Sequence, residues 1–226
     1  MIYYVFDVDG TITPPRKQME PNLVQLFLDF CLNNNVILVS GSDSNMIHEQ
    51  IPQNILNNVK LYTCSGVEGI SFDLEYDISD DDLLKELDFY LNTSEFKLKT
   101  GKHINFRKGM INFSIVGRNA SDAEREEYSE FDKEYKERIT IINDLSKKFQ
   151  KYDFLIGGEI SIDISKKGIN KSLVAKDIII SDPDAYIMFY GNQILDGNDY
   201  PLAKFIAENN IGTSTQITNL HIKNIL

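Results

Sequence analysis

The sequence predicts an α/β fold in which a doubly wound, Rossmann-like core is interrupted by an inserted α+β domain. Short apolar runs alternate with helical patterns in the first and last parts of the chain, whereas the middle carries a hairpin pattern and helices. A chain of 226 residues is long enough for two modest domains. We therefore expect a core built from residues 1–76 and 165–226, with residues 77–164 inserted between its two parts.

The first part of the core alternates strands and helices. Residues 1–7 are apolar with no helical period, which is typical of a strand buried on both faces of a parallel sheet. Pro21 suits the first turn of a helix, and Asp43 or Ser44 can cap another. The elements predicted after the first strand are a helix at 21–32, a strand at 36–40, a helix reaching 47–51 and a strand at 59–63.

The inserted segment begins with a helix and a hairpin. Residues 81–91 have the apolar spacing of an amphipathic helix. Residues 104–116 read as a β-hairpin that turns at Lys108 and Gly109. In its second strand the apolar residues alternate on one face, and the other face carries polar groups. The apolar residues of that face are Ile111, Phe113 and Ile115.

The second half of the insert is predicted to be one long helix followed by a strand. A capping-box sequence at Ser121 opens a helical pattern that continues to Phe149. In the strand expected at 159–164, Ser161 and Asp163 share the face opposite the isoleucines. Two polar groups are thus directed to the same side of a sheet.

The alternation of strands and helices returns after about residue 165. A helix is expected after 168–170, a buried strand at 185–190, a polar loop at 191–199 and a final αβα stretch. The carboxyl ends of parallel strands meet at one edge of a doubly wound sheet, so we expect the active site at that edge, facing the insert.

Composition excludes several function classes. With 23 basic and 34 acidic side chains the net charge is −11, so we expect neither nucleic acid nor an anionic membrane as a partner. No apolar run reaches the roughly 20 residues of a membrane span, and the start lacks a signal-peptide pattern, so we expect a cytoplasmic protein. Cys31 and Cys64 are interpreted as buried free thiols, and the three histidines show no metal-ligand spacing.

The strongest chemical signal is the pair Asp7 and Asp9, which stand where the first strand breaks into a loop. Two carboxylates so close repel each other unless a cation lies between them, and Mg²⁺ prefers such oxygen ligands and also binds phosphate. The pair therefore predicts metal-assisted phosphoryl transfer. Asp7 is the expected nucleophile, which forms an acyl phosphate, and Asp9 is the expected acid and base.

This loop resembles that of the haloacid dehalogenase superfamily, and further motifs of that superfamily follow in order. They are Ser40 or Ser42, then Lys171, then the loop that carries Asn192 and Asp199. A hydroxyl and an ammonium group can hold the oxygens of a transferring phosphoryl group, and the last loop can bring oxygen ligands to a metal.

More narrowly, the chain resembles the eukaryotic-type phosphomannomutase family. The matching stretches are FDVDGTITPPR at 6–16, GSD at 41–43, FRKGMINFS at 106–114, VGR at 116–118, ER at 124–125, GGEISID at 157–163, KGINK at 167–171, GN at 191–192 and GND at 197–199. The resemblance implies that the insert is a cap that closes over a hexose phosphate. It also implies interconversion of mannose 6-phosphate and mannose 1-phosphate, a step of GDP-mannose biosynthesis, through a hexose bisphosphate.

The resemblance also assigns roles to individual residues. The catalytic residues are Asp7, Asp9 and Lys171, and the Mg²⁺ ligands are Asp7, Asp9, Asn192 and Asp199. The substrate-binding residues are Arg16, Ser42, Arg107, Arg118, Arg125, Ser161 and Asp163. Guanidinium groups bind phosphate oxygens in pairs, and a mutase needs a second anion site for the phosphate that does not react.

The chain departs from the family pattern in the last loop. Asn192 stands where many members carry Asp, which predicts weaker Mg²⁺ binding, and Asp196 replaces a small residue. Two alternative functions stay open from the residues: a Mg²⁺-dependent sugar phosphatase of the same superfamily, and a non-catalytic protein that binds sugar phosphates.

The family resemblance further implies a homodimer formed through the cap. We place the expected contact on the apolar face around Leu83, Leu84 and Leu87.

Overall fold

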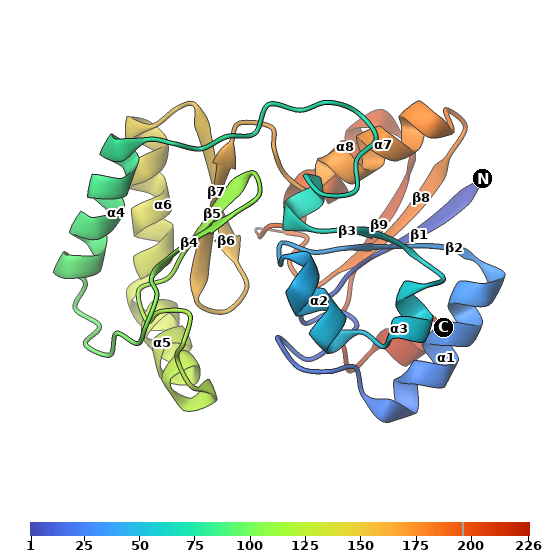
Figure 1. The fold of residues 1–226 in the computed structure, drawn as a ribbon, viewed down its shortest axis with the longest axis horizontal. Coiled ribbons are helices and arrows are strands. Elements are labelled where there is room, and N and C mark those ends of the chain that lie inside the picture. The colour runs from blue at the N-terminus through green and yellow to red at the C-terminus, as the bar shows by residue number, and fades with distance from the viewer. Residues whose placement is uncertain (196) are drawn as a thin grey trace. The chain divides into compact units, whose positions relative to one another are not determined.

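The computed structural model describes residues 1–195 and 197–226, so Asp196 lies outside the described residues. The chain forms two compact units. One, here called the core unit, comprises Met1–Leu74 and Ile169–Leu226, and the other, here called the cap unit, comprises Glu75–Gly168 (Figure 1). Each is described below by itself.

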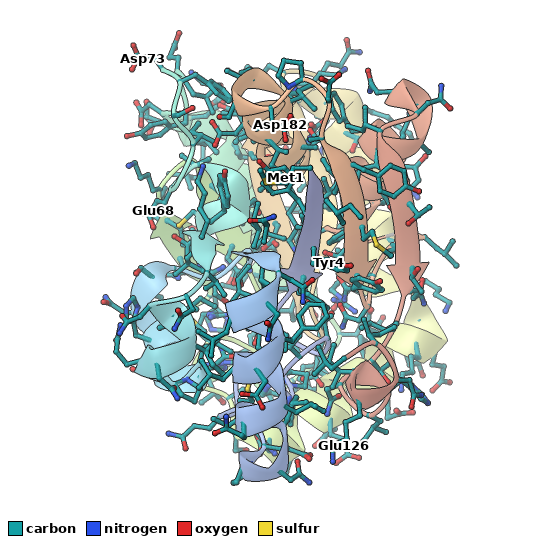
Figure 2. All side chains as sticks on the ribbon, turned by 90° about the vertical axis from the view of Figure 1, so that its right-hand side faces the viewer. Met1, Tyr4, Glu68, Asp73, Glu126 and Asp182 are labelled. Carbon is teal, nitrogen blue, oxygen red and sulfur yellow. The ribbon has the colours of Figure 1, made fainter. Side chains whose placement is uncertain are left out.

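The core unit contains a five-stranded sheet in the order β3-β2-β1-β8-β9. Every neighbouring pair in it is parallel. Its strands are β1 (Ile2–Asp7), β2 (Asn35–Val39), β3 (Lys60–Tyr62), β8 (Tyr186–Gly191) and β9 (Gly212–Gln216). The salt bridge between the Met1 ammonium and Asp182, at 3.3 Å, lies at the start of β1 (Figure 2).

Helices cover both faces of this sheet, which confirms the predicted doubly wound α/β architecture. One face packs against α1 (Pro21–Asn33), α2 (Ser44–Gln50) and α3 (Gln53–Leu56). The other packs against α7 (Ser172–Ser181) and α8 (Tyr200–Asn209). Two short 3₁₀ turns, η1 (Cys64–Gly66) and η2 (Ile222–Asn224), complete the unit. Among the described residues, none of the helices is both long enough and apolar enough to span a bilayer.

The cap unit is an antiparallel sheet with helices packed on one face. Its strands have the order β4-β5-β7-β6, with bounds β4 (Ile104–Arg107), β5 (Met110–Phe113), β6 (Tyr152–Gly157) and β7 (Ser161–Lys166). The helices are α4 (Asp81–Thr93), α5 (Asp122–Tyr135) and α6 (Glu137–Lys148). Their apolar residues share one core with Ile111 and Phe113 of β5 and Ile162 and Ile164 of β7, so the alternate residues of both strands lie on the opposite face.

The structure corrects two expectations for the cap unit. The single long helix is instead two helices, because Lys136 adopts a left-handed conformation with φ 55° that ends α5 and opens α6. Two of the leucines expected at a dimer contact, Leu83 and Leu87, are also not available for it, because both are fully buried in the cap unit's own core. Leu84 packs against that core and is partly exposed.

A buried carboxylate ties α7 to β3 in the core unit. Asp177 is fully buried and accepts hydrogen bonds from Lys60 Nζ at 2.7 Å and the Tyr62 hydroxyl at 2.5 Å. It also accepts bonds from the Ser71 backbone N–H at 2.8 Å and from Ser71 Oγ at 2.5 Å. Burial alone would raise the pKa of Asp177, but these hydrogen bonds outweigh it and lower the pKa to about 2.

We expect Asp177→Ala to lower the free energy of unfolding by about 3 kcal/mol, because the buried Tyr62 hydroxyl and the Ser71 donors lose their acceptor. Lys60 adds little to this loss, since its side chain is 48% exposed and water can replace the carboxylate. Denaturant unfolding at pH 7 measures the change. The exposed Asp184→Ala serves as the control, and an equal loss in both variants would contradict the assignment.

The same carboxylate predicts a pH dependence. The pKa of Asp177 in the folded state, about 2, lies below the unfolded value of about 3.9. Its stabilisation is therefore complete above the unfolded value and is lost as the pH falls toward the folded value. We expect the stability difference between the wild type and Asp177→Asn to narrow between about pH 4 and pH 2.

Candidate active site

Asp7 is the last residue of β1, at the carboxyl edge of the core sheet, and is only 4% exposed. The strand is buried because Val5 and Phe6 pack into the two apolar layers on opposite faces of the sheet. Beyond it the chain turns at once, and the Thr11 hydroxyl donates a hydrogen bond back to Asp7 Oδ2 at 2.8 Å. The loop thus fixes the carboxylate that the sequence marks as the nucleophile.

Lys171 joins Asp7 to the loop after β8. It stands at the N-cap of α7, and its side chain is fully buried. Lys171 Nζ donates to Asp7 Oδ1 and to Asp199 Oδ1, each at 2.6 Å, and to Asn198 Oδ1 at 3.2 Å. Residues more than 160 positions apart in the chain (Asp7 and Lys171, separated by 164) therefore meet at one point.

The electrostatics of this cluster are governed by burial. Burial raises the pKa of Asp7 above its usual range; Lys171 opposes that shift, and the charge of Asp199 adds to it. Burial alone would lower the pKa of Lys171, but Asp199 and Asp7 together raise it, so the ammonium stays charged.

Carboxylates, which Mg²⁺ prefers as ligands, meet at this point. Asp7 and Asp199 both contact Lys171, and the Asn192 amide lies against the loop after β1, since a Cβ on Gly10 would come 2.3 Å from Asn192 Nδ2. Across residues 1–195 and 197–226, three Asp, Glu, His or Cys side chains do not converge into a metal cluster. Of the predicted Mg²⁺ ligands, Asp7 and Asp199 thus meet at one point, through Lys171.

Asp9 is held beside Ser42 of the loop after β2. Its Oδ1 accepts a hydrogen bond from the Arg16 backbone N–H at 2.8 Å, and its Oδ2 accepts one from Ser42 Oγ at 3.2 Å. Ser42 is in turn positioned by its own N–H, which donates to Ser40 Oγ at 3.0 Å. Two of the predicted site residues, Asp9 and Ser42, are thus brought together at the same sheet edge as Asp7.

The arginines of the predicted phosphate site lie on different elements. Arg16 belongs to the core unit, in a turn where its φ is 59°, and its side chain is exposed. The other three belong to the cap unit: Arg107 ends β4, Arg118 follows Gly117 in the loop before α5, and Arg125 lies in the first part of α5.

Arg125 has the environment expected of an anion-binding group. It is 8% exposed, and its NH2 donates to Glu159 Oε2 at 3.1 Å, while its buried NH1 has no hydrogen-bond partner among the described residues. Glu159 is 48% exposed, so this carboxylate is largely solvated. One edge of the Arg125 guanidinium therefore stays available for an anion.

Ser161 and Asp163 both lie on the face of the cap sheet opposite its helices, as predicted. Ser161 Oγ donates to the Gly157 carbonyl oxygen at 2.5 Å. Asp163 Oδ1 accepts a hydrogen bond from Asn112 Nδ2 at 2.6 Å. The two side chains are thus held by different partners on neighbouring strands.

Several residues of these clusters had no role in the sequence analysis. Thr11 and Asn198 lie inside the motifs already noted, and only the fold shows that they contact Asp7 and Lys171. Glu159 also lies inside a motif. Asn112 could have been found from the sequence, because it alternates with Ile111 and Phe113 and so belongs to the polar face of the hairpin.

The doubly wound core, the acid pair at the end of its first strand and the inserted antiparallel sheet define a class of α/β proteins with an inserted α+β domain. Solved structures agree on the fold. A haloacid dehalogenase subclass IIB sugar phosphatase aligns with TM-score 0.58 at 13% identity over 99% of this chain and 91% of that one. An IMP-bound IMP-nucleotidase of Plasmodium falciparum aligns with TM-score 0.60 at 14% identity over 99% of this chain and 66% of that one.

Sequence similarity narrows the class. Residues 24–226 match the family described as "Eukaryotic phosphomannomutase". Phosphomannomutase 1 of Dictyostelium discoideum is 33% identical over 215 residues, which cover 88% of this chain and 85% of that protein. The chain belongs to the eukaryotic phosphomannomutase family.

Proposed function

We propose that this protein is a phosphomannomutase that interconverts mannose 6-phosphate and mannose 1-phosphate through a phosphorylated Asp7 and a hexose bisphosphate. The observation that carries the proposal is the Asp7 carboxylate, buried at the end of β1 and held by Lys171 and Thr11. A carboxylate fixed at two points needs no reorientation before it attacks phosphorus. Family membership supplies the mannose phosphates as the substrate pair.

The reaction divides into two transfers. In the first, the free hydroxyl of the hexose monophosphate attacks the acyl phosphate of phosphorylated Asp7, Asp9 takes the proton of that hydroxyl, and the bond from phosphorus to the Asp7 oxygen breaks, which leaves a hexose bisphosphate. The bisphosphate then turns around and presents its other phosphate. In the second transfer an Asp7 oxygen attacks that phosphorus, the bond from phosphorus to the sugar oxygen breaks, and Asp9 returns the proton to the sugar oxygen. The isomeric monophosphate leaves and Asp7 is phosphorylated again, so atoms and charge balance over the cycle.

Lys171 and Ser42 are assigned to the transferring phosphoryl group. The Lys171 ammonium is fixed beside Asp7, and the Ser42 hydroxyl is fixed beside Asp9. Both can donate hydrogen bonds to phosphoryl oxygens, whose charge grows in the transition state. Asp7, Asp9, Asn192 and Asp199 are the residues that would hold Mg²⁺, which supplies charge neutralisation for the phosphoryl oxygens.

The decisive experiment supplies mannose 1-phosphate, Mg²⁺ and a trace of hexose bisphosphate, then measures mannose 6-phosphate and free phosphate in parallel. A mutase yields the isomer with little phosphate, because the sugar hydroxyl rather than water accepts the phosphoryl group. Free phosphate without isomer would make the protein a sugar phosphatase. No turnover of any hexose phosphate would leave a non-catalytic binding protein.

We predict that Arg125→Ala lowers kcat/KM for mannose 1-phosphate by more than tenfold, a loss of at least about 1.4 kcal/mol, because a charge-assisted phosphate contact is removed. Phosphorylation of Asp7 by acetyl phosphate, which has no second phosphate to grip, should stay unchanged. Lys133→Ala on the same helix is the control, since that side chain is 66% exposed. Equal kinetics for Arg125→Ala and the control would remove Arg125 from the phosphate site.

The assembly and location of the protein are further parts of the proposal. We place it in the cytoplasm as a homodimer formed through the cap unit, on surfaces other than the buried leucines of α4. A dimeric mass in light scattering that becomes monomeric on removal of residues 75–168 is the expected result.

A further inference from the structure

Asn112 lies in a row of polar residues on the face of the cap sheet opposite its helices. It is in register with Asn105 of β4 on one side and with Asp163 of β7 on the other. Its neighbours Ile111 and Phe113 point into the helical core, so Asn112 and Asp163 share the opposite face. Despite that position, Asn112 is only 2% exposed.

The orientation of the Asn112 amide follows from its contact with Asp163. Asn112 Nδ2 lies 2.6 Å from Asp163 Oδ1, and an ionised carboxylate only accepts hydrogen bonds, so the amide nitrogen must face it. The amide oxygen, Asn112 Oδ1, is therefore turned away from Asp163. It is buried and has no hydrogen-bond partner within the part of the chain that the structure describes.

The Asp163 carboxylate is held in place by the strand beside it. Asp163 is in register with Leu155 of β6, yet its side chain leans along that strand over Gly157. A Cβ on Gly157 would lie 2.6 Å from Asp163 Oδ1 and 2.7 Å from its Cγ, so any larger residue would displace the carboxylate. Gly157 thus leaves the space in which Asp163 and Asn112 meet.

A buried acceptor without a donor costs free energy, and proteins seldom leave one unless a ligand or an ordered water satisfies it. A sugar hydroxyl can satisfy this acceptor, because its O–H group can donate a hydrogen bond to a neutral amide oxygen. The phosphate groups of the substrate cannot serve when fully ionised, since they then have no hydrogen to donate to the amide oxygen.

We propose that Asn112 is a specificity-determining residue whose Oδ1 accepts a hydrogen bond from one hydroxyl of the hexose phosphate, next to the hydroxyl bound by Asp163. The inference rests on the proposed function and deepens it. The Asn112 and Asp163 side chains contact each other through the amide nitrogen of Asn112. Acceptor oxygens on two side chains in contact can accept hydrogen bonds from hydroxyls on neighbouring sugar carbons, so the pair would recognise a vicinal diol. A phosphate ester without hydroxyls gains nothing from Asn112.

The test is a series of 2-, 3- and 4-deoxy hexose 1-phosphates measured with wild type, Asn112→Ala and Asn112→Ser. Asn105→Ala is the matched control, because Asn105 is the register neighbour of Asn112 on β4. We expect wild type to lose at least about tenfold in kcat/KM on the one analogue that lacks the bound hydroxyl, and the Asn112 variants to show no such difference. The control variant should discriminate as wild type does.

Asn112 also holds Asp163, so a direct role must be separated from an indirect one. Asp163→Asn is measured on the same series. We expect this variant to lose discrimination against a different analogue, the one that lacks the adjacent hydroxyl. Phosphorylation of Asp7 by acetyl phosphate, which has no hydroxyl, should be unchanged in every variant and reports an intact fold. Asn112→Ser provides a milder change if Asn112→Ala unfolds.

Three results would overturn the inference. In the first, the Asn112 variants and Asp163→Asn lose discrimination against the same deoxy analogue, which would mean that Asn112 only positions Asp163. The variants could keep the full discrimination of wild type while wild type turns over hexose phosphates, which would refute the inference and leave the proposed function standing. Failure of wild type to turn over any hexose phosphate would overturn both.

Discussion

Asp7→Asn is expected to abolish turnover, with a fall in kcat of at least about 10⁴-fold. An amide oxygen does not attack phosphorus, so the acyl phosphate cannot form. The fold should persist, because the amide has the shape of the carboxylate and Lys171 keeps its bond to Asp199 Oδ1 at 2.6 Å. Incubation with acetyl phosphate followed by mass measurement should show a phosphorylated wild type and an unmodified variant.

The control for this variant is Asp73→Asn, which changes an exposed carboxylate of the same unit (Figure 2). Both variants lose one negative charge, so a difference between them reports the position and not the charge. A phosphorylated Asp7→Asn protein, or turnover within tenfold of the control, would move the nucleophile elsewhere and remove the basis of the proposed function.

The fold class could be predicted because the apolar periodicity that marks strands and helices is visible in short stretches of the sequence. Residues 1–7 read as a strand with no polar face, and β1 is indeed covered on both sides. The helix cap at Asp43 was also predictable, and its carboxylate accepts the Met46 N–H at 3.1 Å. The strand β6 was missed, since three consecutive apolar residues, Phe154, Leu155 and Ile156, break the alternation of apolar and polar residues that marks a strand with one buried face.

The break between α5 and α6 had no signal in the sequence. Lys136 is an ordinary helix former, and neither Gly nor Pro marks the site. Tertiary contacts hold the break: Arg138 Nε donates to Asp132 Oδ2 at 2.8 Å, and its NH1 donates to the carbonyl oxygens of Gly158 at 2.9 Å and Ser161 at 3.2 Å. A sequence pattern carries no information on contacts between such distant positions.

The site was partly predictable, because the ends of the strands can be located from the sequence. Asp7, Asp9 and Ser42 were expected together because each follows a strand of one parallel sheet, and the structure places Ser42 Oγ 3.2 Å from Asp9 Oδ2. Lys171 and Asp199 were also expected at the site, but the contacts of Lys171 with Asp7 and with Asp199 were not. That Lys171 bridges Asp7 and Asp199 depends on the packing of α7 against the sheet, and pattern alone gives no angle or depth for that helix.

Asp9→Asn is expected to lower kcat for mannose 1-phosphate by about 10²–10³-fold, because the sugar oxygen loses its proton donor. The substitution should preserve the local structure, since an amide oxygen can still accept the Arg16 backbone N–H that Asp9 Oδ1 accepts at 2.8 Å. Phosphorylation of Asp7 by acetyl phosphate should survive, because acetate is a good leaving group that needs no protonation. The phosphorylated protein should therefore accumulate in this variant.

The contrast with Asp7→Asn separates the two carboxylates. Loss of the nucleophile stops both the sugar reaction and the acetyl phosphate reaction, whereas loss of the acid and base stops only the sugar reaction. Asp73→Asn again serves as the control, because it removes one exposed carboxylate of the same unit and leaves Asp9 in place. If Asp9→Asn also failed to become phosphorylated, Asp9 would be needed to build the phosphoryl site, and proton transfer would have to be assigned to another group.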